Sequence, residues 1–206
     1  MSGLFDLDGK PVKYGNKIAD LMCLNVLFVL CSIPIFTFGA SYTAMHYVLL
    51  KIYRDEENNI FKTFFYAFKS NFKQTTMIWM IYLLWGVLLI ADYFVSGQML
   101  AANRYIKYFL CLVTFLLVFS LSWVFVLLSR YENTLIQTLK NAYIIGVRHF
   151  MKTVMMILMF LLPFLLILFY PAMIPVVFLL GFSGSGLLQT VLYSKVFEKY
   201  EHQEQP

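Results

Sequence analysis

Long apolar stretches alternate with short polar segments along almost the whole chain. Five stretches have close to the 20 mostly apolar residues that a helix needs to cross about 30 Å of hydrocarbon. They lie at about 18–37, 75–95, 105–129, 152–170 and 172–193. A sixth stretch, at about 39–53, is shorter and more polar. The pattern predicts an all-α, polytopic membrane protein in which 1–206 is a single membrane domain and 1–17 is a polar lead-in.

The first two stretches raise a question of connection. A single helix over 18–53 would be about 54 Å long at 1.5 Å per residue, far more than one bilayer crossing requires. Pro34 removes a backbone donor and disfavours helical geometry at the residue before it, and Gly39 tolerates a wide range of backbone conformations. Two arrangements remain: two spans joined by a bend at Pro34–Gly39, or one span followed by an interfacial helix.

Two segments between the spans have the period of amphipathic helices, at about 58–73 and 133–150. In the first, phenylalanines follow one face and Lys62, Lys69 and Lys73 follow another. Both segments are too charged to span, so we expect helices at the cytoplasmic surface of the membrane. The alternative is a docking surface for a cytoplasmic partner or a coupling helix of a transport system.

The same segments contain a weak internal repeat. RDEENNIFKTFFYAF (54–68) aligns with RYENTLIQTLKNAY (130–143) with one residue deleted. Each copy has an apolar span before and after it, so the units at about 39–95 and 105–170 are parallel repeats. Such repeats are common in transporters, although duplication also builds scaffolds.

Composition agrees with a membrane location. Hydrophobic residues make up 61% of the chain and charged residues only 13%, about half the fraction usual in soluble domains. With six spans, fourteen of the sixteen basic residues lie on one side of the membrane, and only Arg104 and Lys107 lie on the other. If 39–53 does not cross, the asymmetry weakens to eleven against five. The positive-inside rule therefore favours six transmembrane helices with both termini cytoplasmic, and it accounts for the net charge of +5 without nucleic-acid binding.

Four stretches carry a family resemblance: SIPIFTFGASYTA (32–44), YVLLKIYRDEE (47–57), FFYAFKSNFKQ (64–74) and TLKNA (138–142). The most specific part is Pro34, Thr37 and Gly39 followed by Lys51, Arg54, Asp55 and Glu56. The sequence resembles the YesL-like family of small bacterial membrane proteins, a domain of unknown function often encoded beside carbohydrate ABC-transporter and glycoside-degradation genes. The resemblance implies a bacterial plasma-membrane location and a role in sugar uptake or its regulation. It also implies an ABC permease or a membrane sensor as partner, and it supplies no catalytic residues.

Three residues are candidates for ligand binding. Tyr42 and His46 share one face of the predicted helix over 39–53, and Asp92 lies near the end of the predicted span 75–95. An ionisable residue within a membrane span is by default a functional hypothesis. The alternatives are an interhelical hydrogen bond for His46 and a solvated position for Asp92.

The densest charge follows the predicted helix 39–53, at Arg54, Asp55 and Glu56. Together with the three lysines of 58–73, these residues form a candidate partner-docking surface. The alternative is helix capping and local salt bridges, and the matching Arg130 and Glu132 favour a structural corner that is used twice.

Small residues four apart predict close helix packing, at Ala40 and Ala44 and at Gly181 and Ser185. The surrounding GFSGSG (181–186) lacks the strand-to-helix context of a nucleotide site. No catalytic or metal-ligand motif occurs, so we expect neither an enzyme nor a cofactor.

Two functions remain open. The first is an accessory or regulatory component of carbohydrate uptake, and the second is a small stand-alone solute transporter that forms a homo-oligomer such as a dimer. A polar cavity beside His46 would favour the transporter, whereas a solid apolar core there would favour the accessory role.

Overall fold

The computed structural model describes residues 10–56, 59–96, 104–131 and 134–204, and every regular element in these ranges is helical. The α-helices are α1 (Lys10–Ser32), α2 (Phe38–Tyr53), α3 (Ile60–Ser96), α4 (Arg104–Leu128), α5 (Leu135–Arg148), α6 (Phe150–Phe169), α7 (Ile174–Val176) and α8 (Phe182–Glu204). Three short elements join them: the 3-10 helices η1 (Ile35–Thr37) and η2 (Pro171–Met173), and the π-helix η3 (Val177–Gly181). The predicted all-α class is confirmed. The lead-in 1–17 becomes helical from Lys10 onward, and its first nine residues lie outside the described part.

Five segments in the described ranges are long and apolar enough to cross a membrane. They are Gly15–Ser32, Ile60–Ala91, Tyr108–Leu128, Phe150–Phe169 and Pro171–Tyr200. Helix α2 has 16 residues, which is about 24 Å at 1.5 Å per residue and short of the hydrocarbon thickness. The chain is thus a multi-span membrane protein by length and composition, and a sixth span through α2 stays a prediction.

The bend between α1 and α2 lies where Pro34 and Gly39 predict it. Pro34 has an extended backbone, with φ −71° and ψ 113°. The Thr37 hydroxyl donates to the carbonyl oxygens of Cys31 at 2.6 Å and of Pro34 at 2.7 Å. The first bond satisfies an acceptor in the last turn of α1, and the second closes the turn at Pro34, so the chain can reverse within a few residues.

Helix α3 corrects one prediction. The segment 58–73 was expected as a separate surface helix before a span at 75–95, but Ile60–Ser96 is one continuous helix of 37 residues. Nothing between Lys73 and Thr75 breaks the helix, and the Thr75 hydroxyl donates back to the Asn71 carbonyl oxygen at 2.7 Å. The residues change from polar to apolar at this point because α3 passes from a polar to an apolar environment, and the helix itself continues.

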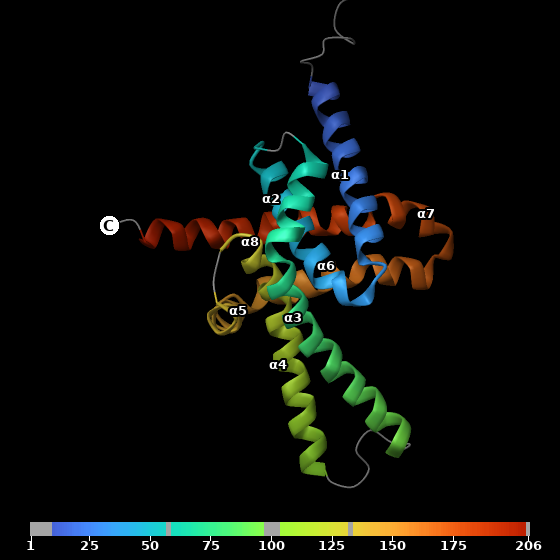
Figure 1. Ribbon diagram of the computed structural model, residues 1–206, viewed down its shortest axis with the longest axis vertical. Helices are drawn as coiled ribbons and strands as arrows, with labels where there is room; N and C mark the ends of the chain where they lie inside the picture. Colours follow the sequence, from blue (N-terminus) through green and yellow to red (C-terminus); the bar gives the residue numbers. More distant parts are fainter. Residues whose placement is uncertain (1–9, 57–58, 97–103, 132–133, 205–206) are drawn as a thin grey trace, which may run out of the picture.

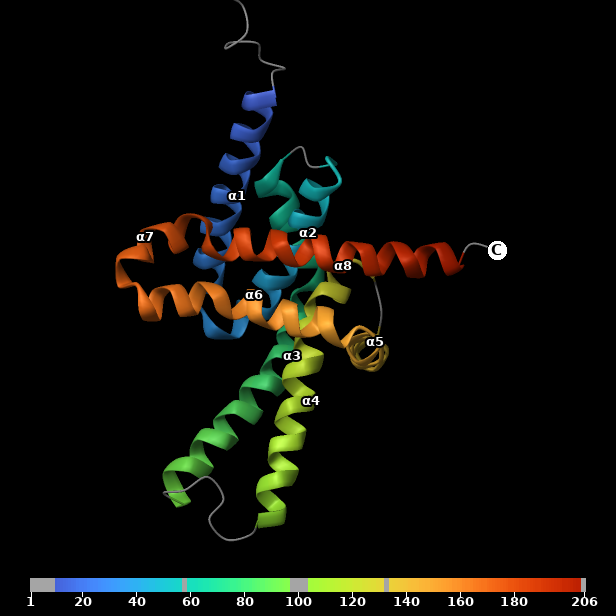
Figure 2. The ribbon, with the colours of Figure 1, turned by 180° about the vertical axis from the view of Figure 1, so that it is seen from behind.

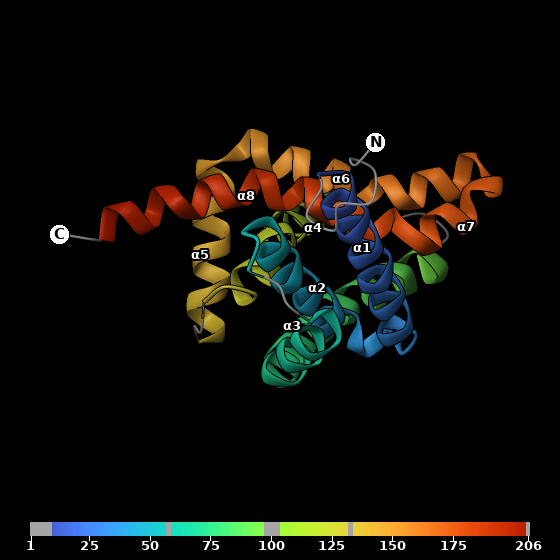
Figure 3. The same ribbon diagram turned by 90° about the horizontal axis from the view of Figure 1, so that it is seen from above.

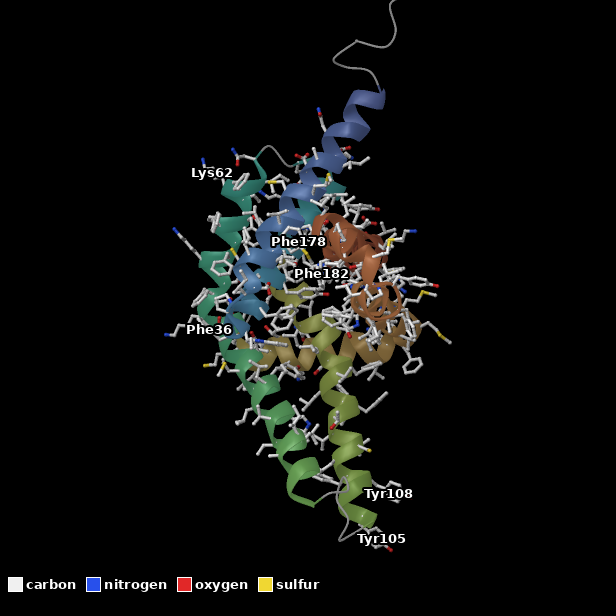
Figure 4. All side chains as sticks on the ribbon, turned by 90° about the vertical axis from the view of Figure 1, so that its right-hand side faces the viewer. Phe36, Lys62, Tyr105, Tyr108, Phe178 and Phe182 are labelled. Atoms are coloured by element: carbon white, nitrogen blue, oxygen red, sulfur yellow. The ribbon has the colours of Figure 1, made fainter. Side chains whose placement is uncertain are left out.

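The bend packs against the middle of α3. The Trp79 indole Nε1 donates to the Ile35 carbonyl oxygen at 2.7 Å. A Cβ added to Gly39 would lie 2.8 Å from Trp79 Cβ and 2.9 Å from the Thr75 carbonyl oxygen. Helix α2 therefore lies beside the first half of α3, and the bend at Phe36 lies part-way along that helix (Figure 4).

The second half of α3 and the first half of α4 extend beyond the other helices as an arm, shown in green (Figure 1). Two hydrogen bonds join its helices: Tyr82 Oη to Ser120 Oγ at 2.8 Å, and Trp85 Nε1 to Thr114 Oγ1 at 3.2 Å. Most of the arm's large apolar side chains are exposed, as a lipid-facing surface requires.

The C-terminal helices run in other directions. Helices α6 and α8 lie side by side and cross the direction of α3 and α4 (Figure 2), and α5 crosses α8 when the molecule is seen from above (Figure 3). The predicted surface segment 133–150 contains α5, which ends at Arg148, and the next residue, His149, has φ −118° and ψ 46°. The two copies of the sequence repeat therefore fold differently, since the first continues into its span and the second breaks.

The predicted span 172–193 lies within the candidate span Pro171–Tyr200, and its helical run changes type along its length. It contains α7, the π-helix η3 and the start of α8. The buried Asn25 amide donates to the carbonyl oxygens of Val177 at 3.1 Å and Phe178 at 2.7 Å, and its Oδ1 accepts from the Ser183 N–H at 2.7 Å. One side chain of α1 thus satisfies backbone groups of the π-helix η3 and of Ser183. Hydrocarbon cannot supply hydrogen bonds to such groups.

Candidate functional site

The predicted pair Tyr42 and His46 lies where α2 meets α8. The Tyr42 hydroxyl donates to Gln189 Oε1 at 2.9 Å. The His46 ring makes edge-to-face contacts with Tyr42, at a centroid distance of 4.5 Å, and with Tyr193, at 5.6 Å. The Tyr193 hydroxyl in turn pairs with Thr190 Oγ1 at 3.0 Å. The structure therefore brings Tyr42 and His46 together within a buried aromatic cluster.

His46 is packed on every side. It is fully buried, and neither ring nitrogen has a hydrogen-bond partner in the described part of the chain. Gly186 of α8 faces it closely, since a Cβ there would lie 2.7 Å from Leu49 Cδ1 and 3.8 Å from His46 Cε1. A proton relay needs a chain of hydrogen-bonded donors and acceptors, and in the described part of the chain neither ring nitrogen of His46 is bonded to one.

An apolar cavity of about 260 Å³ adjoins this cluster. Its lining residues are Tyr42, Val118, Leu121, Ser122, Phe125, Met156, Ile157, Phe160, Leu161 and Gln189. The Tyr42 hydroxyl and the Gln189 carbonyl oxygen at its wall are already bonded to each other. The space suits an apolar group better than a saccharide, which needs several unpaired hydrogen-bonding side chains.

The third candidate ligand residue, Asp92, lies on α3 and apart from Tyr42 and His46, which lie on α2. Position 92 lies 13 residues beyond Trp79, about 20 Å further along α3 and within the arm. The side chain of Asp92 lies outside the described part of the structure.

A second, polar groove of about 640 Å³ lies between α2, α3, α4 and the start of α5. Its lining residues are Tyr47, Tyr66, Ser70, Asn71, Gln74, Leu128, Ser129, Arg130, Tyr131 and Thr134. The Tyr47 and Tyr66 rings lie 6.4 Å apart, and the Lys51 ammonium group lies 5.2 Å from the Tyr47 ring centre. Aromatic rings, amides, hydroxyls and a guanidinium group together can bind a polar partner or ligand.

Sequence reasoning missed this groove. Ser70, Asn71 and Gln74 lie within a segment whose helical period is set by its phenylalanines. The sequence relates Arg130 only to Arg54, through the internal repeat. The signal available was three polar, uncharged residues on adjoining positions of one helix. Nothing in the sequence showed that the end of α4 faces them.

The predicted docking residues divide into two kinds. Asp55 has φ 56°, a left-handed conformation that is unusual for a residue other than glycine, and its carboxylate pairs with Lys17 at 2.7 Å. Asp55 therefore shapes the corner after α2, as in the structural alternative. Arg54 is half-buried and Glu56 is exposed beside it, whereas Lys62, Lys69 and Lys73 are exposed along α3.

The small residues predicted for close helix packing also differ in what they contact. Ala40 and Ala44 are fully buried in α2 and Ser185 is nearly so, as close packing requires. Gly181 differs, because a Cβ there would lie 2.5 Å from Val177 Cγ1 in its own π-turn. Gly186 makes the close approach of α8 to α2 instead. In the described ranges, no group of three His, Cys, Asp or Glu side chains could hold a metal ion.

Comparison with known families gives one match. Residues 21–93 match the profile of the family described as "Protein of unknown function, DUF624". The matched segment runs from α1 through the bend and α2 to near the end of α3. The YesL-like family is a DUF624 family, so the resemblance found in the sequence is confirmed over this segment. Neither the curated proteins nor the solved structures include a match.

Proposed function

We propose that this membrane protein, whose residues 21–93 match the DUF624 family model, is an accessory or regulatory component of carbohydrate uptake of the ABC type in a bacterial plasma membrane. The carbohydrate context comes from the YesL-like resemblance. The choice of an accessory role over a stand-alone transporter comes from the packing around His46.

That packing is the observation that carries the proposal. A transporter for a polar solute needs polar groups that are free to bind it near the middle of the fold. Tyr42 and Gln189 bond to each other, His46 is fully buried beside the Tyr42 and Tyr193 rings, and the adjoining cavity has an almost entirely apolar lining. The packing around Tyr42 and His46 therefore supports a role as a stable core more than a role as a substrate path.

The accessible polar surface lies elsewhere, and it supports an interaction with another protein. Tyr66 lines the polar groove and is 65% exposed. Lys62, Lys69 and Lys73 are exposed on the same stretch of α3. Aromatic side chains beside charged ones are common at protein interfaces, so the groove and this stretch of α3 are the proposed site for a permease subunit.

Site-specific photo-crosslinking in membranes tests this assignment. A photoreactive phenylalanine analogue would replace Tyr66 in the groove or, as control, Leu112, which is exposed in the arm. We expect the Tyr66 position to form an adduct with the membrane subunit of a carbohydrate ABC transporter, and the Leu112 position not to form it. Equal adducts at both positions, or none at Tyr66 in cells growing on a carbohydrate whose uptake needs that transporter, would contradict the proposal.

A further inference from the structure

Five basic side chains gather where α5, α6 and α8 meet, at a place we name the basic corner. They are Arg148, His149, Lys152, Lys195 and Lys199. Arg148 Nη1 donates to the Tyr200 hydroxyl at 3.5 Å, and the His149 and Tyr200 rings lie 6.1 Å apart. Lys195 and Lys199 are one helical turn apart on α8, so they share a face. Three separate elements thus bring positive charge to one location.

The pKa of His149 agrees with a gathering of positive charge at the basic corner. Partial burial, and then the charges of Lys152, Lys199 and Arg148, lower the pKa of His149 from its ordinary value. Its Nε2 atom is buried and lacks a hydrogen-bond partner in the described part. The neighbouring charges are therefore close enough to repel one another.

No carboxylate in the described ranges forms an ion pair with Arg148, Lys152, Lys195 or Lys199. Glu198 directly precedes Lys199 in α8 and is exposed, yet it pairs with none of them. Like charges held together in this way favour a bound anion, because a negative group between them replaces repulsion with attraction.

An apolar stripe begins beside the basic corner and follows α6. Met151, Met155, Leu158 and Leu162 are 71%, 49%, 58% and 42% exposed, at a spacing that places them on one face. From Met151 to Leu162 the stripe is roughly 16 Å long. A soluble anion would use only the charges, whereas a lipid would use the charges and the stripe together.

We propose that the basic corner binds the headgroup phosphate of an anionic phospholipid, with an acyl chain along Met151, Met155, Leu158 and Leu162. Clusters of basic residues between membrane helices bind anionic headgroups in this way. The positive-inside asymmetry places the basic corner on the predicted cytoplasmic side, level with the lipid phosphates of that leaflet. This proposal is independent of the role in carbohydrate uptake.

Native mass spectrometry of the full chain, released from nanodiscs, tests the proposal. The nanodiscs would contain phosphatidylcholine with one-fifth phosphatidylglycerol. We expect phosphatidylglycerol to be retained in preference to phosphatidylcholine, and a Lys152→Gln/Lys195→Gln/Lys199→Gln variant to lose it. Each lysine near an anionic surface contributes roughly fivefold in affinity, so the triple variant should bind about a hundredfold more weakly.

A matched control separates the site from overall charge. The Lys62→Gln/Lys69→Gln/Lys73→Gln variant removes the same charge from the exposed stretch of α3 and should retain the lipid. Equal loss in both variants, or equal retention of the two lipids by the unmodified protein, would overturn the proposal. Inorganic phosphate that displaces the bound lipid at millimolar concentration would indicate a soluble anion instead. If the triple variant does not fold, Lys195→Gln alone, at an exposed position of α8, should weaken retention severalfold, and unchanged retention would count against the site.

Discussion

Gly39 shows how one residue sets the packing of the segment 21–93, which matches the DUF624 model. Its missing side chain lets α2 approach α3 where the bend meets Trp79. The atoms in the way of a Cβ are Trp79 Cβ and the Thr75 carbonyl oxygen, which cannot turn aside as the end of a long side chain can. Pro34 and Gly39 predict a bend from the sequence alone. The sequence does not show that this bend packs against α3.

We therefore expect Gly39→Ala to lower the free energy of unfolding by about 1–3 kcal/mol, as overpacking does. Gly86→Ala is the matched control, because a Cβ at that position meets nothing within 4 Å and alanine stabilises a helix interior by about 1 kcal/mol. Thermal unfolding in detergent measures both. Equal effects of the two substitutions would mean that α2 does not contact α3 closely at the bend.

At the scale of elements, the corner between α5 and α6 depends on Thr153. Its hydroxyl donates to the carbonyl oxygens of Gly146 at 3.0 Å and His149 at 3.2 Å, and it accepts from Trp123 Nε1 at 2.8 Å. The first copy of the repeat lacks a corresponding break, and its helix continues. Local side-chain bonding therefore explains why two similar sequences fold differently.

Thr153→Val keeps the shape of this side chain and removes its hydrogen bonds. We expect it to cost about 1–3 kcal/mol, because Trp123 is fully buried and its indole N–H would lose its partner. Thr114→Val, which removes the longer 3.2 Å bond to Trp85 in the arm, should cost less. Comparable losses would show that the corner does not depend on Thr153.

The sequence patterns identified most helices, but they did not show where one predicted helix continues into the next. Apolar length located α1, α4 and α6, and Pro34 located the first bend. The fusion of 58–73 with 75–95 was missed because a change of polarity resembles an end, although no residue there breaks a helix. The π-helical turn at Val177–Gly181 could not be predicted from local pattern, because its carbonyl groups pair with Asn25, which is 152 residues away from Val177. The burial of Tyr42 and His46 likewise depends on α8, which periodicity in α2 cannot show.

At the scale of the whole molecule, the helices predicted to cross the membrane do not all run in the same direction (Figure 2). Lys62 and Tyr105 lie toward opposite ends of the long axis (Figure 4), and α3 alone is about 55 Å long. That length exceeds the hydrocarbon thickness, so the two ends of α3 should lie on opposite sides of the membrane. The α6–α8 pair crosses this direction.

Cysteine labelling in intact cells tests the orientation. In a background with Cys23, Cys31 and Cys111 replaced by serine, Tyr105→Cys should react with an impermeant maleimide from outside. Lys62→Cys should react only after the membrane is opened, because the basic residues favour the cytoplasm. Both native side chains are exposed, so a missing reaction reports the membrane side and not burial. Reaction of both from outside would reject the predicted orientation.

The central claim is that the Tyr42–His46 cluster is a packed core and not a substrate path. Its most direct test is uptake of radiolabelled mono- and disaccharides by proteoliposomes that contain this protein alone. We predict the same uptake as in protein-free liposomes, and a folded His46→Leu variant with unchanged thermal stability or better, since it removes two unpartnered buried nitrogens. Saturable uptake by the unmodified protein that is lost in His46→Leu would contradict the claim.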